Sequence, residues 1–300
     1  MSSENAVPVL RGKGPLVFRF EYLAFLLVMF GLVGAKGEDR FFDSNGVRIR
    51  YVVEGKGAPV VLIHGMTLDV ESQWDEAGIR KALTNNYQVI AFDCRGHGKS
   101  GKPHEATAYG VQMVEDVRRL LDHLQIKKAH VVGYSLGATI ALKFLTMYPE
   151  RCLSVVLGEG AVYHERYDFS AEDQAARNSA AVSDPAQVMP KLASDAPADA
   201  VRRRDAWVKM PHDFKAYAAI FQSLKALKVT NAKLEANRVP VLGLFCRSSE
   251  ERAQYLTMRL SNFKAGFISG THLDAYLRPE FVSKMKAFLD AQQGRAKKEP

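Results

Sequence analysis

The chain has 300 residues, of which 47% are hydrophobic and 25% are charged, and its formal net charge is +8. This apolar fraction supports a sizeable core, which excludes a mainly disordered chain, and three cysteines are too few for a disulfide scaffold. The positive charge permits an anionic partner, but no recognition motif accompanies it, so we expect no nucleic-acid partner.

An apolar run of twelve residues, Tyr22–Val33, lies near the start of the chain. Three basic residues precede it: Arg11, Lys13 and Arg19. Twelve apolar residues are too few to cross a bilayer, which takes about 20. The basic flank, the short apolar core and the small residues Gly34 and Ala35 predict a signal peptide over residues 1–35.

Cleavage of this segment would remove three bases and two acids and leave a formal charge of +7. The sequence therefore predicts a periplasmic or secreted protein without a stable membrane span in its mature form. The alternative is that the apolar segment stays and anchors the chain to a membrane. The cysteines Cys94, Cys152 and Cys246 lie at the ends of different predicted strands. We expect three reduced, buried thiols there, which argues mildly against export.

Short β-branched or aromatic runs alternate with amphipathic stretches along most of the chain. Seven strands are predicted: Val47–Val53, Val60–Ile63, Gln88–Phe92, His130–Gly133, Leu153–Leu157, Val241–Phe245 and Ala265–Ile268. Most are continuous apolar runs, as a parallel sheet covered on both faces requires.

Three helices are predicted between or after these strands. The first follows the apolar stripe of Val114, Val117, Leu121 and Leu124, the second begins just after Ser135 and stops before Pro149, and the third lies near Glu280–Leu289. Strands that alternate with helices indicate an α/β fold with a doubly wound, mostly parallel sheet.

The segment 161–238 interrupts this alternation, and its apolar spacing is helical. We interpret it as a helical cap inserted between two late strands. The core is then expected over residues 40–160 and 239–291, and residues 292–300 are expected to form a flexible tail.

The strongest motif is Gly133-Tyr134-Ser135-Leu136-Gly137, which follows a predicted strand and precedes a helix. This is the context of a nucleophile elbow, in which a serine sits on a tight, strained turn. The glycines remove Cβ atoms that would clash with neighbouring backbone, and the helix N-terminus favours developing negative charge. Ser135 is therefore the candidate nucleophile.

A second motif, His64-Gly65-Met66, ends another strand and fits a tight loop that turns a backbone N–H toward the reacting centre. An oxyanion hole needs two such donors, and we assign them to Met66 and Leu136. The side chain of His64 is expected to be structural, as are Gly65, Gly133 and Gly137.

The segment Asp93–Ser100 contains Gly-Lys-Ser, which suggests a phosphate loop. That motif requires glycine at position 93 and a helix after the serine. The chain has Asp93 and continues into Gly101-Lys102-Pro103 instead. We therefore expect no nucleotide binding. The sequence also lacks a His-Glu-x-x-His motif and a Cys/His cluster at ligand spacing, so no metal or organic cofactor is expected.

His272, in Ser269-Gly270-Thr271-His272, follows the last predicted strand and precedes the final helix. A late histidine in that place can return to a serine at the sheet's C-terminal edge, and the order serine, acid, histidine is the one expected in this fold class. His272 is the candidate general base.

Together these motifs resemble the α/β-hydrolase superfamily in order and spacing over roughly residues 40–290, with the insertion 161–238 matching its variable cap. The chain resembles the esterase, lipase and carbon–carbon hydrolase branches that use serine. It does not look like haloalkane dehalogenases or epoxide hydrolases, whose nucleophile is a carboxylate at the position of Ser135.

The third member of the triad departs from the family pattern, which places an aspartate shortly after the strand Val241–Phe245. An ungapped comparison puts Ser249 there, and Glu250 follows one residue later. Some members of the superfamily carry the acid after the preceding strand instead, where this chain has Glu159. We expect Glu250, with Glu159 as the alternative and a chain without the acid as a third option.

The resemblance implies a serine hydrolase that cleaves a small or medium carboxylic ester, thioester or lactone. One alternative is a carbon–carbon bond hydrolase or perhydrolase on the same residues. Another is a non-catalytic ligand-binding homologue, because the usual aspartate is absent. The acyl group, the alcohol and the oligomeric state are not readable from the sequence.

Overall fold

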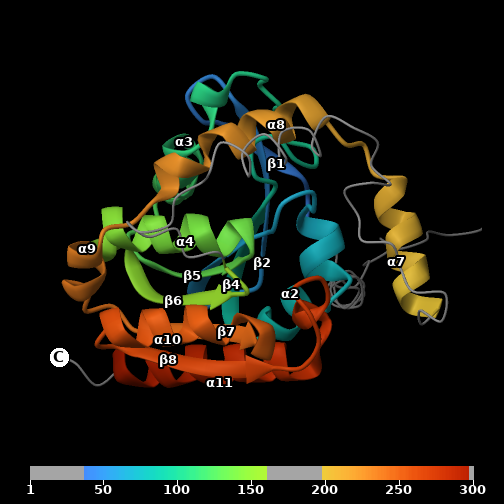
Figure 1. Ribbon diagram of the computed structural model, residues 1–300. Coiled ribbons are helices and arrows are strands. Elements are labelled where there is room, and N and C mark those ends of the chain that lie inside the picture. Colours follow the sequence, from blue (N-terminus) through green and yellow to red (C-terminus); the bar gives the residue numbers. More distant parts are fainter. Residues whose placement is uncertain (1–36, 161–197, 297–300) are drawn as a thin grey trace, which may run out of the picture. The chain divides into compact units, whose positions relative to one another are not determined.

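The computed structural model describes residues 37–160 and 198–296. An eight-stranded sheet with the order β1-β2-β4-β3-β5-β6-β7-β8 forms its centre (Figure 1). The strands are β1 (Arg40–Asp43), β2 (Arg48–Glu54), β3 (Ala58–Ile63), β4 (Tyr87–Phe92), β5 (Ala129–Tyr134), β6 (Cys152–Gly158), β7 (Val241–Cys246) and β8 (Phe263–Ile268). Strand β2 pairs antiparallel with β1 and β4, and the other pairs are parallel. The seven predicted strands and the mostly parallel α/β fold are confirmed.

The helices are α2 (Ile79–Leu83), α3 (Val111–His123), α4 (Leu136–Met147), α7 (Ala198–Val208), α8 (Phe214–Ser223), α9 (Asn231–Glu235), α10 (Glu250–Arg259) and α11 (Pro279–Ala296). The three predicted helices correspond to α3, α4 and α11. Helix α11 continues to Ala296, which corrects the expectation of a flexible tail from residue 292. Its apolar residues Phe281, Met285 and Leu289 are fully buried, and no proline follows before position 300 to stop the helix.

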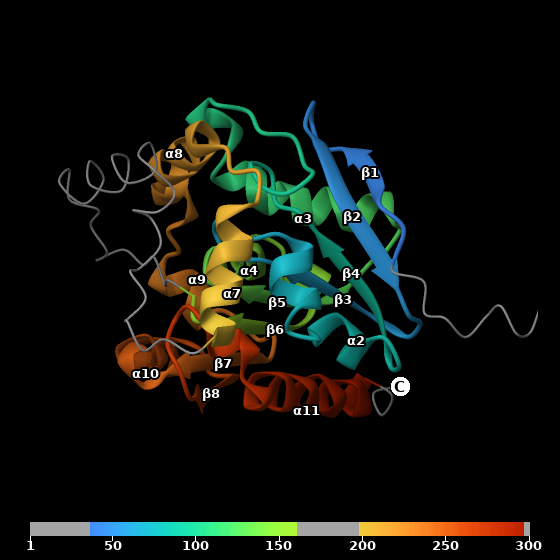
Figure 2. The ribbon, with the colours of Figure 1, turned by 90° about the vertical axis from the view of Figure 1, so that its right-hand side faces the viewer.

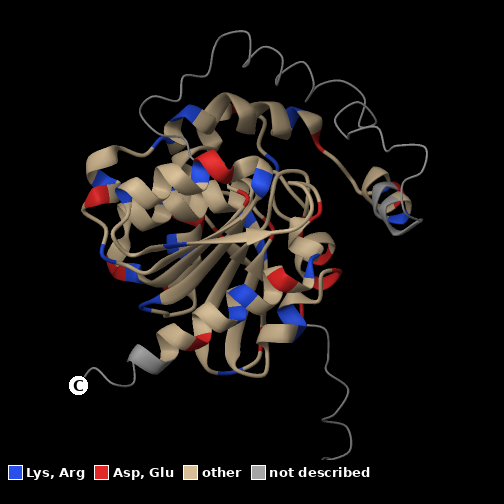
Figure 3. Cartoon of the chain, turned by 60° about the horizontal axis from the view of Figure 1, so that its bottom comes forward, with Lys and Arg blue, Asp and Glu red and all other residues tan. Residues whose placement is uncertain are grey.

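Alternate residues of the central strands pack into two hydrophobic clusters on opposite faces of the sheet. Val61 and Ile63 of β3 pack with α3 and α4, whereas Val60 and Leu62 pack with α2 and α11. Figure 2 shows α3 and α11 on the two sides of the strands. In Figure 3 the central strands carry almost no charged residues, because both of their faces are covered.

The parallel strands bring distant residues to one edge of the sheet. Ser135 follows β5, Glu159 follows β6, and His272 follows β8. Because the carboxyl ends of parallel strands lie at the same edge, these three residues can meet there.

Helices α7, α8 and α9 lie between β6 and β7, in the segment predicted to be the cap. Residues 161–197, the first half of that segment, lie outside the described residues. Helix α8 begins at Asp213, whose carboxylate accepts a hydrogen bond from the Ala216 N–H at 3.0 Å. Its buried residues Tyr217 and Ile220 join the hydrophobic cluster on the α3 and α4 side of the sheet.

The three cysteines are buried and free, as predicted. Among the described helices, none has the length and hydropathy of a membrane span. The apolar run Tyr22–Val33 and the predicted signal peptide lie outside the described residues.

Candidate active site

The turn that carries Ser135 lies between β5 and α4 and has a strained backbone. Ser135 adopts φ 52° and ψ −113°, a conformation that residues with a side chain rarely adopt. A Cβ atom at Gly133 would lie 2.1 Å from the carbonyl oxygen of Gly137. A Cβ atom at Gly137 would lie 2.0 Å from the carbonyl oxygen of Ile63. Both positions therefore exclude any side chain, which is why the turn needs glycine on each side of the serine.

Ser135 and His272 lie in contact although 137 residues separate them in the sequence. The Ser135 Oγ is 2.9 Å from the His272 Nε2, a distance at which the hydroxyl can donate its proton to the imidazole. The loop of His272 is held by Tyr134, whose hydroxyl donates to the His272 carbonyl oxygen at 2.8 Å. The imidazole side chain is 45% exposed, so it faces the solvent side of the site.

The carboxylate beside His272 belongs to Glu159, which corrects the choice of Glu250. The Glu159 Oε2 lies 3.3 Å from the His272 Nδ1. Glu250 begins α10, is exposed, and lies 3.9 Å from the Arg247 guanidinium. The physical reason is topological: β6 lies between β5 and β7, so a residue at the end of β6 is next to the serine turn. A helix begins at position 250, which places that side chain on the surface.

Glu159 is fully buried and hydrogen-bonded on both oxygens. The Cys246 N–H donates to Oε1, and the Ser249 hydroxyl donates to Oε2 at 3.0 Å. Burial by itself raises the pKa of Glu159, but the hydrogen bonds from His272, Cys246 and Ser249 outweigh it and leave the pKa below its usual range. The carboxylate is therefore ionised at neutral pH and holds the imidazole with its Nδ1–H toward Glu159.

Ser249 stands at the position where the family pattern has an aspartate, and its side chain contacts Glu159. Its hydroxyl bonds to Glu159 across the boundary between β6 and β7. The serine at this position is a sequence feature that could have favoured Glu159 over Glu250, because its hydroxyl can donate to a carboxylate from the neighbouring strand.

The loop His64-Gly65-Met66 lies against the serine turn. A Cβ atom at Gly65 would be 3.3 Å from the Ser135 Cβ, and the Gly65 N–H donates to the Gln73 side-chain oxygen at 2.6 Å. Gln73 is fully buried and so fixes the loop from behind. The N–H of Leu136 is at the first position of α4, where a helix offers no internal partner. Both expected oxyanion donors, Met66 and Leu136, therefore belong to backbone segments that flank Ser135.

His64 is a buried part of this loop. Its Nδ1 lies 2.7 Å from the Gly65 carbonyl oxygen, and its Nε2 accepts from the Cys94 N–H at 2.9 Å. Burial lowers the pKa of His64, so the ring is neutral and its two nitrogens are both occupied by backbone.

The segment Asp93–Ser100 folds as a buried turn held by Asp93. The carboxylate of Asp93 accepts from the N–H groups of Val70 and Lys99 at 3.0 and 2.8 Å and pairs with Arg50 at 3.4 Å. These contacts give Asp93 a structural role in the turn.

A contact from the inserted segment reaches Thr67, beside the loop His64-Gly65-Met66, and sequence reasoning missed it. The Trp207 indole N–H of α7 donates to the Thr67 carbonyl oxygen and hydroxyl at 3.2 and 3.1 Å. Thr67 follows Met66 and has φ 64°. Trp207 is 4% exposed, and the His212 ring lies against it with centroids 4.2 Å apart. No periodicity marks this pair, because it joins a helix to a loop 140 residues away.

Within the described ranges, no cluster of three or more His, Cys, Asp and Glu side chains is arranged to hold a metal ion. The site thus consists of a strained serine, an imidazole, a buried carboxylate and two backbone segments that flank the serine.

Such a site on such a sheet defines an α/β-hydrolase enzyme. The chain belongs to the α/β-hydrolase fold family, whose sequence profile matches residues 58–242, more than half of the chain.

Individual relatives share parts of the chain. A 2-hydroxy-6-oxo-6-(2'-aminophenyl)hexa-2,4-dienoic acid hydrolase of Metapseudomonas resinovorans is 32% identical over 45% of this chain and 50% of its own length. A soluble epoxide hydrolase of Corynebacterium sp. is 39% identical over 33% of this chain and 34% of its own length. The chain therefore spans half or less of the curated relatives it matches. The sequence was expected not to resemble epoxide hydrolases, whose nucleophile is a carboxylate. One region of the chain does match such an enzyme, but position 135 is a serine.

Solved structures match over much more of their length. An esterase from Exiguobacterium antarcticum superposes with a TM-score of 0.72 over 84% of this chain and 100% of its own, at 18% identity. At that identity the similarity shows the shared fold.

Proposed function

We propose that this protein is a serine hydrolase that cleaves a small or medium carboxylic ester, thioester or lactone through an acyl-enzyme at Ser135. The observation that carries the proposal is the continuous relay from Ser135 through His272 to the buried Glu159, with contacts of 2.9 and 3.3 Å. This relay also favours an enzyme over a non-catalytic ligand-binding homologue, which has no need for a strained serine beside an imidazole.

In the first step the Ser135 Oγ attacks the substrate carbonyl carbon and the His272 Nε2 takes the hydroxyl proton. The ionised Glu159 stabilises the imidazolium that forms and keeps Nδ1 protonated. The N–H groups of Met66 and Leu136 stabilise the negative charge on the tetrahedral oxygen. The bond from the acyl carbon to the leaving oxygen, or to the leaving sulfur of a thioester, then breaks, and His272 returns the proton to the departing atom.

In the second step His272 takes a proton from water, and the resulting hydroxide attacks the acyl carbon. The tetrahedral intermediate collapses, the bond to Ser135 Oγ breaks, and His272 reprotonates the serine. Trp207 supports both steps by holding Thr67, the residue next to Met66, in its left-handed conformation.

A serine-directed fluorophosphonate tests the proposal. We expect covalent labelling of the folded protein at Ser135, no labelling of Ser135→Ala, and release of acid from p-nitrophenyl esters of graded chain length. Failure to label folded wild-type protein would contradict an activated serine.

Carbon–carbon bond hydrolysis on the same residues is the second candidate, and the similarity to the hexadienoic acid hydrolase favours it. Product analysis separates the two candidates. A protein that cleaves a vinylogous diketone faster than any ester would be assigned to the carbon–carbon branch.

A further inference from the structure

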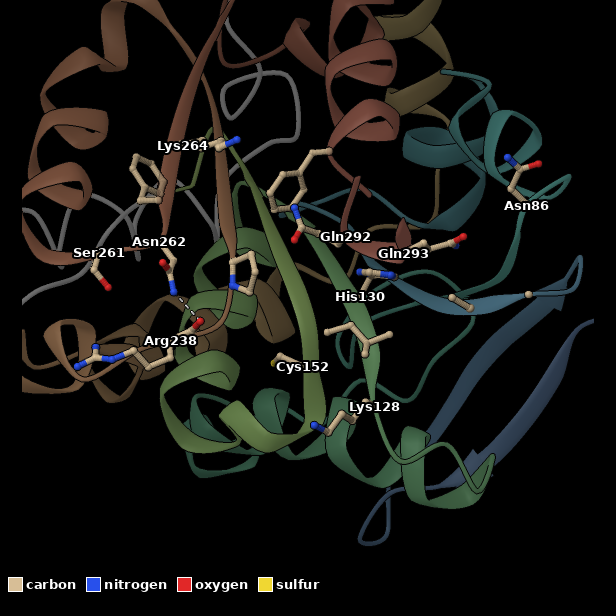
Figure 4. Close-up of a pocket in the computed structure, with 16 residues that line it drawn as sticks. Asn86, Lys128, His130, Cys152, Arg238, Ser261, Asn262, Lys264, Gln292 and Gln293 are labelled. Carbon is tan, nitrogen blue, oxygen red and sulfur yellow. Dashed lines mark hydrogen bonds between the residues drawn. The ribbon is translucent and has the colours of Figure 1, made fainter. Parts of the chain in front are cut away.

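One cavity among the described residues lies away from Ser135, at the opposite edge of the sheet. It has a volume of about 910 Å³ and is formed by the beginnings of β3, β5, β6, β7 and β8 together with the last turns of α11 (Figure 4). His130 lies in it at the start of β5, whereas Ser135 follows the end of the same strand. Five residues of extended strand span about 16 Å, so the cavity is separate from the catalytic site.

One of the residues that line the cavity has a buried polar atom without a partner among the described residues. His130 is 2% exposed, and its Nδ1 lies 2.8 Å from the Ser154 hydroxyl. Its Nε2 has no hydrogen-bond partner among the described residues. Burial lowers the pKa of His130 to about 4, so the ring is neutral at pH 7. If the Ser154 hydroxyl donates to Nδ1, the Nε2–H is a free donor, and buried donors are rarely left unpaired.

A second donor and three cations also belong to the lining of this cavity. The Gln293 amide nitrogen, on α11, is also buried and unpaired among the described residues. Lys128, Arg238 and Lys264 line the cavity, and none of its lining residues is acidic. Figure 4 labels His130, the two glutamines and the three cations among the residues that line the cavity.

The apolar part of the lining includes Leu153, Pro240 and Phe288, and Asn86, Ser261 and Asn262 add uncharged polar groups. The volume is in the range of small-molecule sites, which combine apolar walls with a few polar groups. We propose that this cavity binds a small amphiphilic anion, with its carboxylate or phosphate group toward the cations and an apolar body against Phe288.

Calorimetric titration of the whole protein with decanoate, octyl phosphate, octanol and octyltrimethylammonium, each below its micelle concentration, tests the site. We expect one decanoate or octyl phosphate per chain and at least ten-fold weaker binding of octanol and of the cation. The better of the two anions identifies the head group. Lys128→Glu/Lys264→Glu should weaken anion binding at least ten-fold. The control Lys215→Glu/Lys225→Glu, which reverses two exposed charges outside the cavity, should not.

Histidine ¹⁵N spectra locate the ligand. Decanoate should shift the His130 Nε2 resonance, assigned with His130→Phe, and leave that of His272 unchanged. Equal binding of octanol, unchanged affinity in Lys128→Glu/Lys264→Glu, or a shift of His272 alone would each overturn the proposal. Absence of binding by all four compounds would mean that a water molecule is the only occupant of the donor, and would overturn it as well.

Discussion

Replacing Glu159 by glutamine tests the assignment of the acid most directly. The substitution keeps the size of the side chain but removes the charge that faces the His272 Nδ1 at 3.3 Å. At an effective dielectric constant of about 20, a carboxylate and an imidazolium at this distance attract each other by about 5 kcal/mol. Each ~1.4 kcal/mol corresponds to a factor of ten in rate, so the full interaction would equal a loss of kcat of about 4,000-fold.

Solvent reduces this number, because the imidazole is 45% exposed. We therefore expect kcat of Glu159→Gln to fall by about 10²- to 10⁴-fold, as loss of the orienting carboxylate does in serine proteases. Glu159→Asp keeps the charge and should retain more activity than the glutamine variant. The assay is steady-state hydrolysis of the best p-nitrophenyl ester, with circular dichroism to show that each variant is folded.

Glu250→Gln is the matched control, since that side chain is exposed and meets only Arg247 at 3.9 Å among the ion pairs of the described chain. Its kcat should stay within about two-fold of wild type, in keeping with the small contribution of exposed ion pairs. A folded Glu159→Gln protein with full turnover, or an equal loss in Glu250→Gln, would refute the reasoning.

Four further predictions concern Trp207, Gly137, the ionisation of Glu159 and the segment 1–35. Trp207→Phe keeps an aromatic ring but loses the indole N–H and with it a hydrogen bond of about 1 kcal/mol, so kcat should fall about five-fold with little change in KM. Val208→Ala on the same helix should have no effect, and a change confined to KM in Trp207→Phe would contradict a role in positioning the loop. Gly137→Ala should lower the free energy of unfolding by about 3 kcal/mol or more, because the new Cβ meets backbone at 2.0 Å, and an unchanged urea midpoint would be inconsistent with this packing. The pKa of Glu159 is lowered on folding, so its ionisation stabilises the folded protein. This stabilisation is complete above the ordinary glutamate pKa of about 4.3 and is lost as the pH falls through the pKa of the folded state. The difference in free energy of unfolding between wild type and Glu159→Gln, measured with urea from about pH 3 to 6, should therefore grow with pH. Expression in a bacterial host should yield a chain whose mass lacks residues 1–35, and an intact mass would count against the predicted signal peptide.

The sheet was predictable because its strands are local signals. Each central strand is a short apolar run, which is the sequence pattern of a parallel strand with both faces covered. Strand β1 was missed because it has four residues, Arg40–Asp43, of which only Phe42 is buried. Its formation depends on pairing with β2, and that pairing leaves no periodicity in so short a segment.

The residues of the site also divide into those marked by local sequence and those that depend on long-range contacts. Ser135 was identifiable because a strained turn needs glycine on both sides within five residues, and His272 because it follows the last strand. Glu159 and Trp207 act across 113 and 140 residues, to His272 and Thr67 respectively. Their partners are set by which strands and loops become neighbours.

By itself, the sequence determined the α/β class, the serine turn and the late histidine, because each rests on spacing within one strand, turn or loop. Only the tertiary structure decided which acid faces the imidazole. Both Glu159 and Glu250 follow a strand, but the strand order puts the end of β6 beside the serine turn and the helix at 250 turns its glutamate to solvent. The contact of Trp207 with Thr67 and the cavity that His130 helps to line also depend on the tertiary structure, since both are built from segments that only the folded chain brings together.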